Sequence, residues 1–409
     1  MPSDTDTTTP ASSGDISGQP PAAPDWHSPG KRPPVVLQVV PALVTGGAER
    51  GCIDVALALK AAGAMPLVAS AGGPMVHELE RAGITHITLP LTTKNPLKIL
   101  RNARALAAII RDHKVDIVHA RSRAPAWSAY LACRRTGARY MTTFHAPYNF
   151  GSGIKRRYNA VMARGERIIA ISGFIRDHIL SSYGDIVDPA RIRVIHRGID
   201  TEVFAPERVT PARMAQLATQ WRVPDDRPVI LLPGRLTRWK GQVVMIDALA
   251  KLGRKDVRCL LVGSDQGRTG YRSELESRIR KAGLEGVVHM TDHCNDMAAA
   301  YRLSTVVVSA SREPEAFGRV IVEAQAMGRP VIVTSIGAYQ ETVIPGETAW
   351  VVPPDDPDSL AQALAQALDM PVEQRDAIGA HARAFVASRY TKTRMCADTL
   401  AVYDELLNA

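Results

Sequence analysis

The stretch 304–330 reads STVVVSASREPEAFGRVIVEAQAMGRP and joins an apolar run, a short loop and a helical pattern. Its first eight residues are typical of a strand buried in a parallel sheet, because β-branched side chains pack well on both faces of such a strand. Pro314 disfavours helix in the loop, and Gly-Arg-Pro at 328–330 ends a helix predicted over 319–327. The stretch therefore predicts a strand, a loop and a helix in succession.

Two carboxylates lie near the start of this helix, Glu315 in the loop and Glu323 in the helix itself. Eight residues of continuous helix would separate them by about 12 Å, which is too far for two acids that share one proton. The separation suits two contacts to one elongated ligand, and free amides at the helix start would favour an anion between them. A sugar nucleotide has this shape; the alternative is that both acids are merely solvated.

The same alternation of short apolar runs and helical patterns occurs twice along the chain. It is typical of parallel sheets covered by helices on both faces. We therefore predict an α/β protein with two Rossmann-like domains that face each other across a cleft, where the carboxyl ends of the strands bind ligands. The runs are PPVVLQVV, MPLVAS, ITHITLP, VDIVHA, ARYMTTF, RIIAIS and RIRVIH, then PVILLPGR, RCLLVGS, VVHMTD, STVVVSAS, RPVIVTS and AWVVP.

Composition and pattern divide the chain into four segments. Residues 1–30 are rich in Pro, Ser, Thr and Gly and predict a disordered tail. Residues 31–205 and 206–390 form the two Rossmann-like domains, and the polar stretch 201–226 connects them. The amphipathic pattern over 391–409 predicts a helix that packs back on the N-terminal domain, and another helix is predicted over 52–62, after the first strand.

Several classes of protein are disfavoured by composition. No apolar run approaches the roughly 20 residues of a membrane span, and the first thirty residues lack the charged and apolar parts of a signal peptide. The five cysteines are scattered without a CxxC pattern, which favours a reducing cytoplasm and argues against a zinc site.

Positive charge is concentrated in the N-terminal half. Residues 31–205 hold 25 Lys and Arg against 12 Asp and Glu, whereas residues 206–409 hold 25 of each. Such asymmetry indicates a surface that meets an anionic partner, or alternatively a basic face that is only solvated. Nucleic acid is disfavoured, because the basic half lacks interleaved aromatic residues and any recognisable nucleic-acid module.

The sequence GRLTRWKGQ at 234–242 complements the two acids. It follows the first predicted strand of the second unit and precedes a helix, so Arg235 and Lys240 can both face the phosphates of a ligand. A guanidinium fork beside an ammonium suits a diphosphate. The stretch is not a P-loop, because the GxxxxGK[ST] order is absent.

GRLTRWKG, followed some 80 residues later by EAFGRVIVEA, resembles the retaining, nucleotide-sugar-dependent glycosyltransferases of family four, which have the GT-B fold. Further similar motifs are TGGAER, TTFHAP, IAISGFIRDHI, VIHRGIDTEVF and GAYQETV. The resemblance covers about residues 35–407. Ala316 and Ala338 stand where glycine is usual in the family, which affects only the local backbone.

The resemblance implies roles for particular residues. Arg235 and Lys240 would hold the donor diphosphate, Glu323 would accept hydrogen bonds from the ribose, and Glu315 would orient the donor sugar. The remaining residues implied to lie near donor and acceptor are Gly46, Gly47, His145, Phe317, Gly318 and Arg319, the last three through their backbone amides. His145 has an alternative reading as a core histidine after an apolar strand.

The expected reaction needs no metal and no cofactor besides the nucleotide-sugar co-substrate. The Asp-x-Asp pairs at 4–6 and 356–358 follow no buried strand, and a helix cap explains the second pair. The acceptor domain would be 31–205 and the donor domain 206–390. We expect a UDP-sugar in preference to a GDP-sugar and a lipid-linked or lipopolysaccharide-type glycan as acceptor.

The basic stretch IKRRYNAVMARGER predicts where the protein meets an anionic membrane. Lys155, Arg156 and Arg157 would hold it as a peripheral protein on the inner face of the cell membrane. Two alternatives stay open: a transferase with a small soluble acceptor, and a non-catalytic GT-B protein that only binds anionic surfaces.

Overall fold

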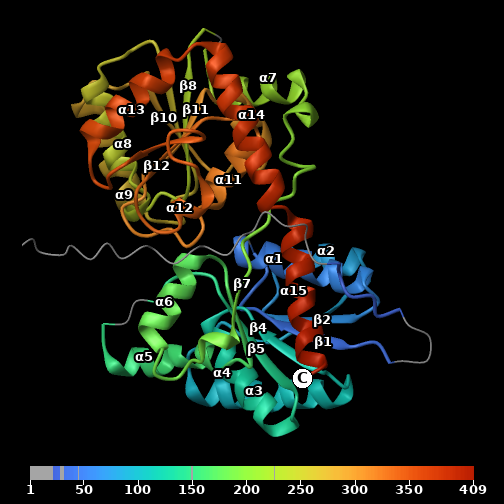
Figure 1. The fold of residues 1–409 in the computed structure, drawn as a ribbon. Coiled ribbons are helices and arrows are strands. Elements are labelled where there is room, and N and C mark those ends of the chain that lie inside the picture. Colours follow the sequence, from blue (N-terminus) through green and yellow to red (C-terminus); the bar gives the residue numbers. More distant parts are fainter. Residues whose placement is uncertain (1–21, 28–31, 45, 149–150, 225) are drawn as a thin grey trace, which may run out of the picture.

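The computed structural model describes residues 22–27, 32–44, 46–148, 151–224 and 226–409. Two parallel sheets, each covered by helices, form two domains that stack one above the other (Figure 1). The predicted two-domain α/β fold is therefore confirmed.

The N-terminal domain contains a seven-stranded parallel sheet in the order β3-β2-β1-β4-β5-β6-β7. The order reverses between β1 and β4, which is the switch point where open α/β sheets bind ligands. The strands are β1 Val35–Val39, β2 Met65–Ser70, β3 Thr85–Thr88, β4 Ile117–Ala120, β5 Arg139–Phe144, β6 Arg167–Ala170 and β7 Ile192–Val194. The helices are α1 Gly47–Ala61, α2 Val76–Arg81, α3 Pro96–Asp112, α4 Arg123–Thr136, α5 Gly153–Asn159 and α6 Gly173–Tyr183, with short 3-10 turns η1 Ala160–Arg164 and η2 Pro189–Arg191.

The C-terminal domain repeats this plan with six parallel strands in the order β10-β9-β8-β11-β12-β13. Its switch point lies between β8 and β11. The strands are β8 Val229–Pro233, β9 Arg258–Val262, β10 Val288–Thr291, β11 Val306–Ser309, β12 Val331–Thr334 and β13 Ala349–Val352. The helices are α7 Pro211–Gln220, α8 Gln242–Leu252, α9 Thr269–Lys281, α10 Met297–Leu303, α11 Arg319–Ala326, α12 Tyr339–Thr342, α13 Pro357–Asp369 and α14 Val372–Arg389, with turns η3 Pro206–Arg208 and η4 Arg238–Lys240.

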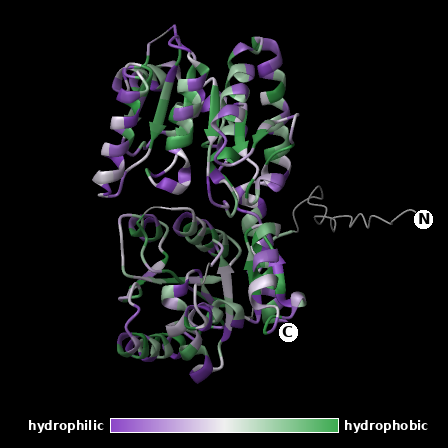
Figure 2. Cartoon of the chain, turned by 90° about the vertical axis from the view of Figure 1, so that its left-hand side faces the viewer, coloured by the Kyte–Doolittle hydropathy of each residue, from purple (hydrophilic) through white to green (hydrophobic). Residues whose placement is uncertain are grey.

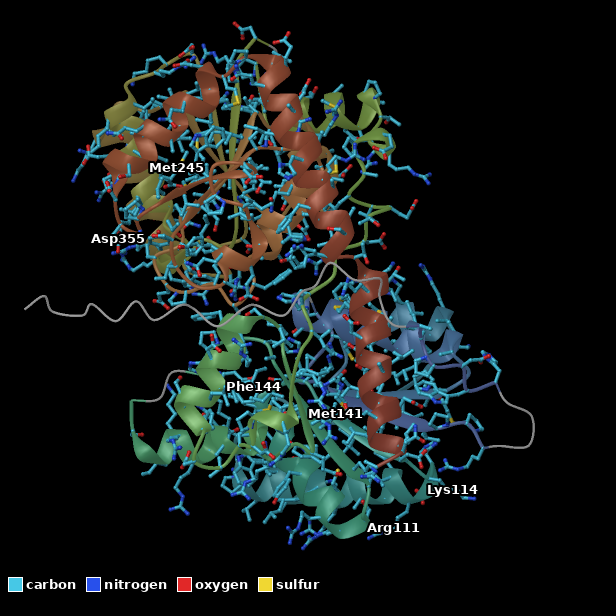
Figure 3. All side chains as sticks on the ribbon, in the orientation of Figure 1. Arg111, Lys114, Met141, Phe144, Met245 and Asp355 are labelled. Atoms are coloured by element: carbon cyan, nitrogen blue, oxygen red, sulfur yellow. The ribbon has the colours of Figure 1, made fainter. Side chains whose placement is uncertain are left out.

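Apolar side chains of both sheets form the cores, since burying them removes apolar surface from water. Strands in the interior are largely hydrophobic, and the helices that cover them carry polar residues outward (Figure 2). In the N-terminal domain, Met141 and Phe144 are buried on β5, whereas Arg111 and Lys114 lie at the surface (Figure 3). Within the described residues, no helix is long and apolar enough to cross a membrane.

The chain returns to the N-terminal domain at its end. Helix α14 packs on α11 of the C-terminal domain, and α15, Lys392–Leu407, then runs along the N-terminal domain against α1 (Figure 1). Tyr403 of α15 is fully buried, and its hydroxyl lies 2.7 Å from Nδ1 of His119 on β4; Nε2 of that ring lies 2.7 Å from Oγ1 of Thr143 on β5. The predicted crossing of the last helix is confirmed.

The two segments that cross between the domains are joined to each other. The amide of Ile199 donates to the Tyr390 carbonyl at 2.8 Å, and the amide of Lys392 donates to the Ile199 carbonyl at 2.7 Å. A Cβ on Gly198 would lie 2.7 Å from the Cα of Lys392, so only glycine fits this close approach. Both crossings therefore meet at one point beside the interface of the domains.

Three sequence expectations differ from the structure in detail. Helix α1 begins at Gly47 rather than at 52. The apolar pattern missed its first turn, because residues 47–50 are only partly buried. The stretch 201–226 contains helix α7, whose Arg213 pairs with Asp296 of the C-terminal domain at 2.7 Å. Residues 1–21 and 28–30 of the predicted tail lie outside the described residues, but 22–27 do not belong to a disordered tail: the amide of Trp26 donates to the Ala62 carbonyl at 2.8 Å.

Candidate active site

The carboxyl ends of the two sheets face each other. The hydroxyl of Ser172, just after β6, donates to the carbonyl of Ala316 in the loop after β11 at 2.7 Å. The loops that carry the predicted donor residues therefore lie at the interface of the two domains.

Arg235 and Lys240 come from the turn between β8 and α8. Arg235 directly follows Gly234 at the end of β8 and is exposed; in the described part of the chain its guanidinium has no hydrogen bond or ion pair. Lys240 ends the turn η4, and Gly241 after it has a φ of +75° and packs against the carbonyl of Ala310, where a side chain would collide. This close turn fixes where Lys240 emerges.

Lys240 and Glu315 form a partly buried ion pair. Lys240 Nζ lies 2.5 Å from Glu315 Oε1, and the side chains are 12% and 18% exposed. The hydroxyl of Ser311 donates to the same carboxylate oxygen at 2.6 Å. Burial raises the pKa of the Glu315 carboxyl, but Lys240 and the two neighbouring serines outweigh it, so that pKa lies below its ordinary value. Glu315 is thus held as an anion.

The start of helix α11 offers free backbone amides. Gly318 adopts a left-handed conformation with φ +80° and caps the helix, and in the described part of the chain no acceptor contacts the amides of Gly318, Arg319 or Val320. Such a helix terminus favours an anion. The ring of Phe317 itself is 4% exposed and packs edge-on against Tyr390, so only its backbone can serve a ligand.

Glu323 lies one turn further along α11 and is 7% exposed. It accepts hydrogen bonds from the hydroxyl of Tyr301 at 2.9 Å and from Nε of Arg319 at 2.7 Å. Helix α11 begins at Arg319, as predicted, so Glu315 lies in the loop before it and Glu323 lies within it. Each acid has its own set of partners, and neither is merely solvated.

The N-terminal side of the interface contains the predicted Gly46, Gly47 and His145. A side chain on Gly46 would meet the Glu49 carboxylate, and one on Gly47 would lie 2.9 Å from a guanidinium nitrogen of Arg197. His145 Nδ1 lies 3.3 Å from Arg197, while Nε2 is buried without a partner among the described residues. Burial and the adjacent Arg197 hold the pKa of His145 well below its usual range, so the ring is neutral. Its role in the reaction stays a prediction.

A carboxylate of the C-terminal domain caps a helix of the N-terminal domain. Glu341 on α12 accepts from the amides of Gly173 and Phe174, at 2.7 and 2.9 Å, and lies 2.7 Å from Nε2 of His196. We call this contact the Glu341 cap. Burial raises the pKa of the Glu341 carboxyl, but these hydrogen bonds outweigh it and the pKa lies below its ordinary value.

The Glu341 cap predicts an acid-sensitive contribution to stability. A carboxyl whose pKa is depressed in the folded protein stabilises fully above its unfolded pKa of about 4.3, and this stabilisation is lost as the pH falls through the lower folded value. The difference in free energy of unfolding between wild type and Glu341→Gln should therefore shrink as the pH falls below about 4.3. Denaturant titrations from about pH 5 downward measure it; a difference that does not shrink over this range would contradict the assignment.

Lys155, Arg156 and Arg157, the predicted membrane residues, lie on α5. Among the described residues, none of them has a hydrogen bond or ion pair with a predicted donor-binding residue. Lys155 and Arg157 are exposed, and in the described residues neither side chain has an ion pair. Arg156 pairs with Asp185 and lies 5.5 Å from the centre of the Tyr183 ring, so its charge is partly engaged within the fold. Ile154 beside them is 84% exposed.

Some residues of the interface were missed by sequence reasoning. Arg197 and Glu341 lie inside the quoted motifs VIHRGIDTEVF and GAYQETV, but no role was inferred for them, since their partners lie more than 50 residues away. Arg121 directly follows β4 and is 4% exposed. Its position after a buried strand is the signal that could have drawn attention to it. Among the described residues, no group of three or more His, Cys, Asp or Glu could hold a metal ion.

Comparison with known proteins agrees with this geometry. Residues 45–203 match the family model described as Glycosyltransferase Family 4, and residues 215–385 match Glycosyl transferases group 1. A crystal structure of a glycosyltransferase from Rickettsia africae ESF-5 is 39% identical, with a TM-score of 0.85 over 92% of this chain and 99% of that chain.

Two curated relatives are more distant. D-inositol 3-phosphate glycosyltransferase 1 of Catenulispora acidiphila is 32% identical over 52% of this chain and 51% of its own length. A GDP-mannose-dependent monoacylated alpha-(1-6)-phosphatidylinositol monomannoside mannosyltransferase of Corynebacterium glutamicum is 27% identical over 71% and 76%. The chain spans about half the length of the first curated relatives it matches. Both domains match family models, and the Rickettsia structure aligns over nearly the whole chain, so this protein belongs to glycosyltransferase family four and has the GT-B fold.

Proposed function

We propose that the protein is a retaining, metal-independent glycosyltransferase that moves a sugar from a nucleoside-diphosphate sugar to a glycan acceptor. The observation that carries this proposal is the Lys240–Glu315 pair beside the free amides of α11, with the exposed Arg235 in the same turn as Lys240. Cations and amide dipoles that are fixed in place before the reaction stabilise negative charge as it develops on a leaving diphosphate. Among the relatives, the Corynebacterium mannosyltransferase is named for a GDP-mannose donor, which supports this class of donor.

Each step can be assigned to residues of the chain. Arg235 and Lys240 bind the diphosphate, Glu323 binds the ribose, and Glu315, held as an anion by Lys240, orients the hydroxyls of the donor sugar. As the bond from the sugar to the phosphate breaks, the leaving phosphate takes the proton of the acceptor hydroxyl, which attacks from the same face. Closure of the two domains excludes water and favours transfer over hydrolysis.

A panel of nucleotide sugars tests the proposal. Thermal shift identifies the donor, and release of UDP or GDP with and without an acceptor then distinguishes transfer from binding alone. UDP-sugars are expected in preference to GDP-sugars, and the activity should survive thorough treatment with EDTA. If no nucleotide sugar raises the unfolding temperature and none is turned over, the proposed enzyme activity is wrong. The alternative, a non-catalytic GT-B protein that binds anionic surfaces, is then favoured.

We further propose that the acceptor is lipid-linked or of the lipopolysaccharide type and that the protein works on the cytoplasmic face of the membrane. The exposed Lys155 and Arg157, with the exposed Ile154 beside them in the sequence, support a peripheral contact. A cavity of about 330 Å³ beside them is lined by Trp127, Arg156, Arg157, Tyr158, Arg164 and Ile186. Each cation near an anionic bilayer contributes about 1 kcal/mol, which salt screens.

We therefore expect co-sedimentation with vesicles that contain anionic lipid, little with neutral vesicles, and release at high salt. Combined Lys155→Glu and Arg157→Glu should weaken this binding, while donor binding stays unchanged; Arg156 is left intact because it pairs with Asp185. The matched control is Arg280→Glu with Lys281→Glu, an exposed pair on the C-terminal domain. Equal binding to both kinds of vesicle, or to neither, would favour the soluble-acceptor alternative.

A further inference from the structure

Two buried arginines converge at the ligand end of the N-terminal sheet. Arg121 follows β4 and is 4% exposed, and Arg197 follows β7 and is 7% exposed. A Cβ placed on Gly51 would lie 2.9 Å from a terminal nitrogen of Arg197 and 3.1 Å from one of Arg121. The two guanidinium nitrogens are therefore at most about 6 Å apart, measured through that point.

Neither charge is neutralised within the fold. Among the described residues, no carboxylate oxygen lies within 4.0 Å of either guanidinium. Among the described residues, the Arg121 guanidinium donates only to the amide oxygen of Gln38, at 2.8 Å, and its Nε is buried without a partner. Asp54 and Glu49 act on Arg197 only at longer range and compensate its charge in part; Asp54 also lies 4.0 Å from Arg50. Burial and the neighbouring cations Arg121 and Arg319 lower the pKa of Arg197 to about 9.

Such an arrangement is costly without a ligand. A buried charge without a counter-ion is strongly unfavourable, and two like charges in a poorly solvated site repel each other. A bound anion would remove both costs. An adjacent cavity of about 200 Å³ is lined by Arg121, Ser122, Arg123, His145, Tyr148 and Glu49. Arg197 lies behind this lining, 3.3 Å from Nδ1 of His145. The Glu49 carboxylate would repel an anion and accept hydrogen bonds from hydroxyl groups, whereas the arginines would attract a phosphate.

The cavity belongs to the acceptor side. All its lining residues come from the N-terminal domain, around the loops after β1, β4 and β5, and so include the switch point between β1 and β4. The donor residues Arg235, Lys240 and Glu323 come from the C-terminal domain. Building on the proposed function, we propose that Arg121 and Arg197 bind a phosphate group of the acceptor, so that the acceptor is a phosphorylated sugar, polyol or lipid-linked glycan.

Calorimetric titration with inorganic phosphate at fixed ionic strength tests the site, in protein whose donor site is blocked by saturating UDP or GDP. We expect phosphate affinity to fall roughly 10- to 100-fold in Arg121→Gln and in Arg197→Gln, and to be partly kept in Arg197→Lys. The exposed control Arg134→Gln, titrated under the same conditions, should bind phosphate like the wild type. Because the substitutions relieve repulsion, the ligand-free unfolding temperature of the two glutamine variants should not fall.

A second titration identifies the source of the phosphate. Stronger binding of glucose 6-phosphate supports a soluble phosphorylated acceptor, and stronger binding of short-chain phosphatidylinositol supports a lipid-borne one. Unchanged phosphate affinity in Arg121→Gln and Arg197→Gln would overturn the inference. Loss of UDP and GDP binding in these variants would also overturn it, because the pair would then serve the donor diphosphate. Failure of the proposed function is a separate result, since it appears as wild-type protein that binds no nucleotide sugar.

Discussion

Alanine in place of Arg235 or Lys240 is expected to lower turnover by roughly 100- to 1000-fold. Each cation is placed to stabilise charge on the leaving diphosphate, and the loss of one such contact costs about 3–4 kcal/mol in the transition state. Arg235 is exposed, and none of the described residues is held by its guanidinium, so Arg235→Ala should leave the unfolding temperature unchanged. Steady-state kinetics with the nucleotide sugar found by the panel gives the effect.

Lys240 requires an additional control, because its removal leaves the partly buried Glu315 carboxylate without its cation. Lys240→Met combined with Glu315→Gln removes both charges and separates lost catalysis from lost folding. Arg238→Ala is a matched substitution in the same turn, at an exposed residue whose partner is Glu274, and should keep near-normal turnover. Near-normal turnover in both the Arg235 and Lys240 variants would show that the phosphates are held elsewhere.

Alanine substitutions of Glu315 and Glu323 are expected to change the kinetic constants in different ways. Glu323→Ala should raise KM for the donor roughly 10- to 100-fold with a smaller effect on kcat, because the ribose is remote from the bond that breaks. Glu315→Ala should mainly lower kcat, since it positions the sugar itself. The conservative Glu323→Gln keeps an acceptor for the Tyr301 hydroxyl and serves as the folding control. Equal effects of both alanine variants on KM and kcat would mean that this division of roles is wrong.

Local pattern was enough to predict most strands. The run MPLVAS, for example, is β2 residue for residue, because a strand buried on both faces is apolar throughout. Helix α1 shows where local pattern is insufficient. Its first turn is only partly buried, so the apolar pattern begins at residue 52 although the helix begins at Gly47. The order of the strands depends on contacts far apart in sequence and was not predicted. The return of α15 to the N-terminal domain was predicted, because its amphipathic pattern requires a surface to pack on.

The residues of the candidate site could be predicted from the sequence only in part. Four site residues could be predicted from the sequence, because each lies in a short motif whose residue types indicate its chemistry: Arg235, Lys240, Glu315 and Glu323. The pairing of Lys240 with Glu315 and the Glu341 cap could not be named, since each joins residues at least 75 positions apart. Arg121 and Arg197 were missed for a different reason: a lone arginine after a strand is ordinary until burial shows that it has no counter-ion.

The position of α15 has a consequence for how the chain is made. The N-terminal domain is not contiguous in sequence, because Tyr403 closes a buried contact with His119 nearly 300 residues earlier. During translation, the site of α15 on this domain must wait, with its apolar surface uncovered, until the whole C-terminal domain has been synthesised. Residues such as Val36, Val55 and Ile117, which share a core with Leu400 and Tyr403, would then be recognised by chaperones that bind exposed apolar segments. Nascent chains stalled before residue 392 should accordingly be protease-sensitive in both the α1 and β4 regions, even when the C-terminal domain has already folded.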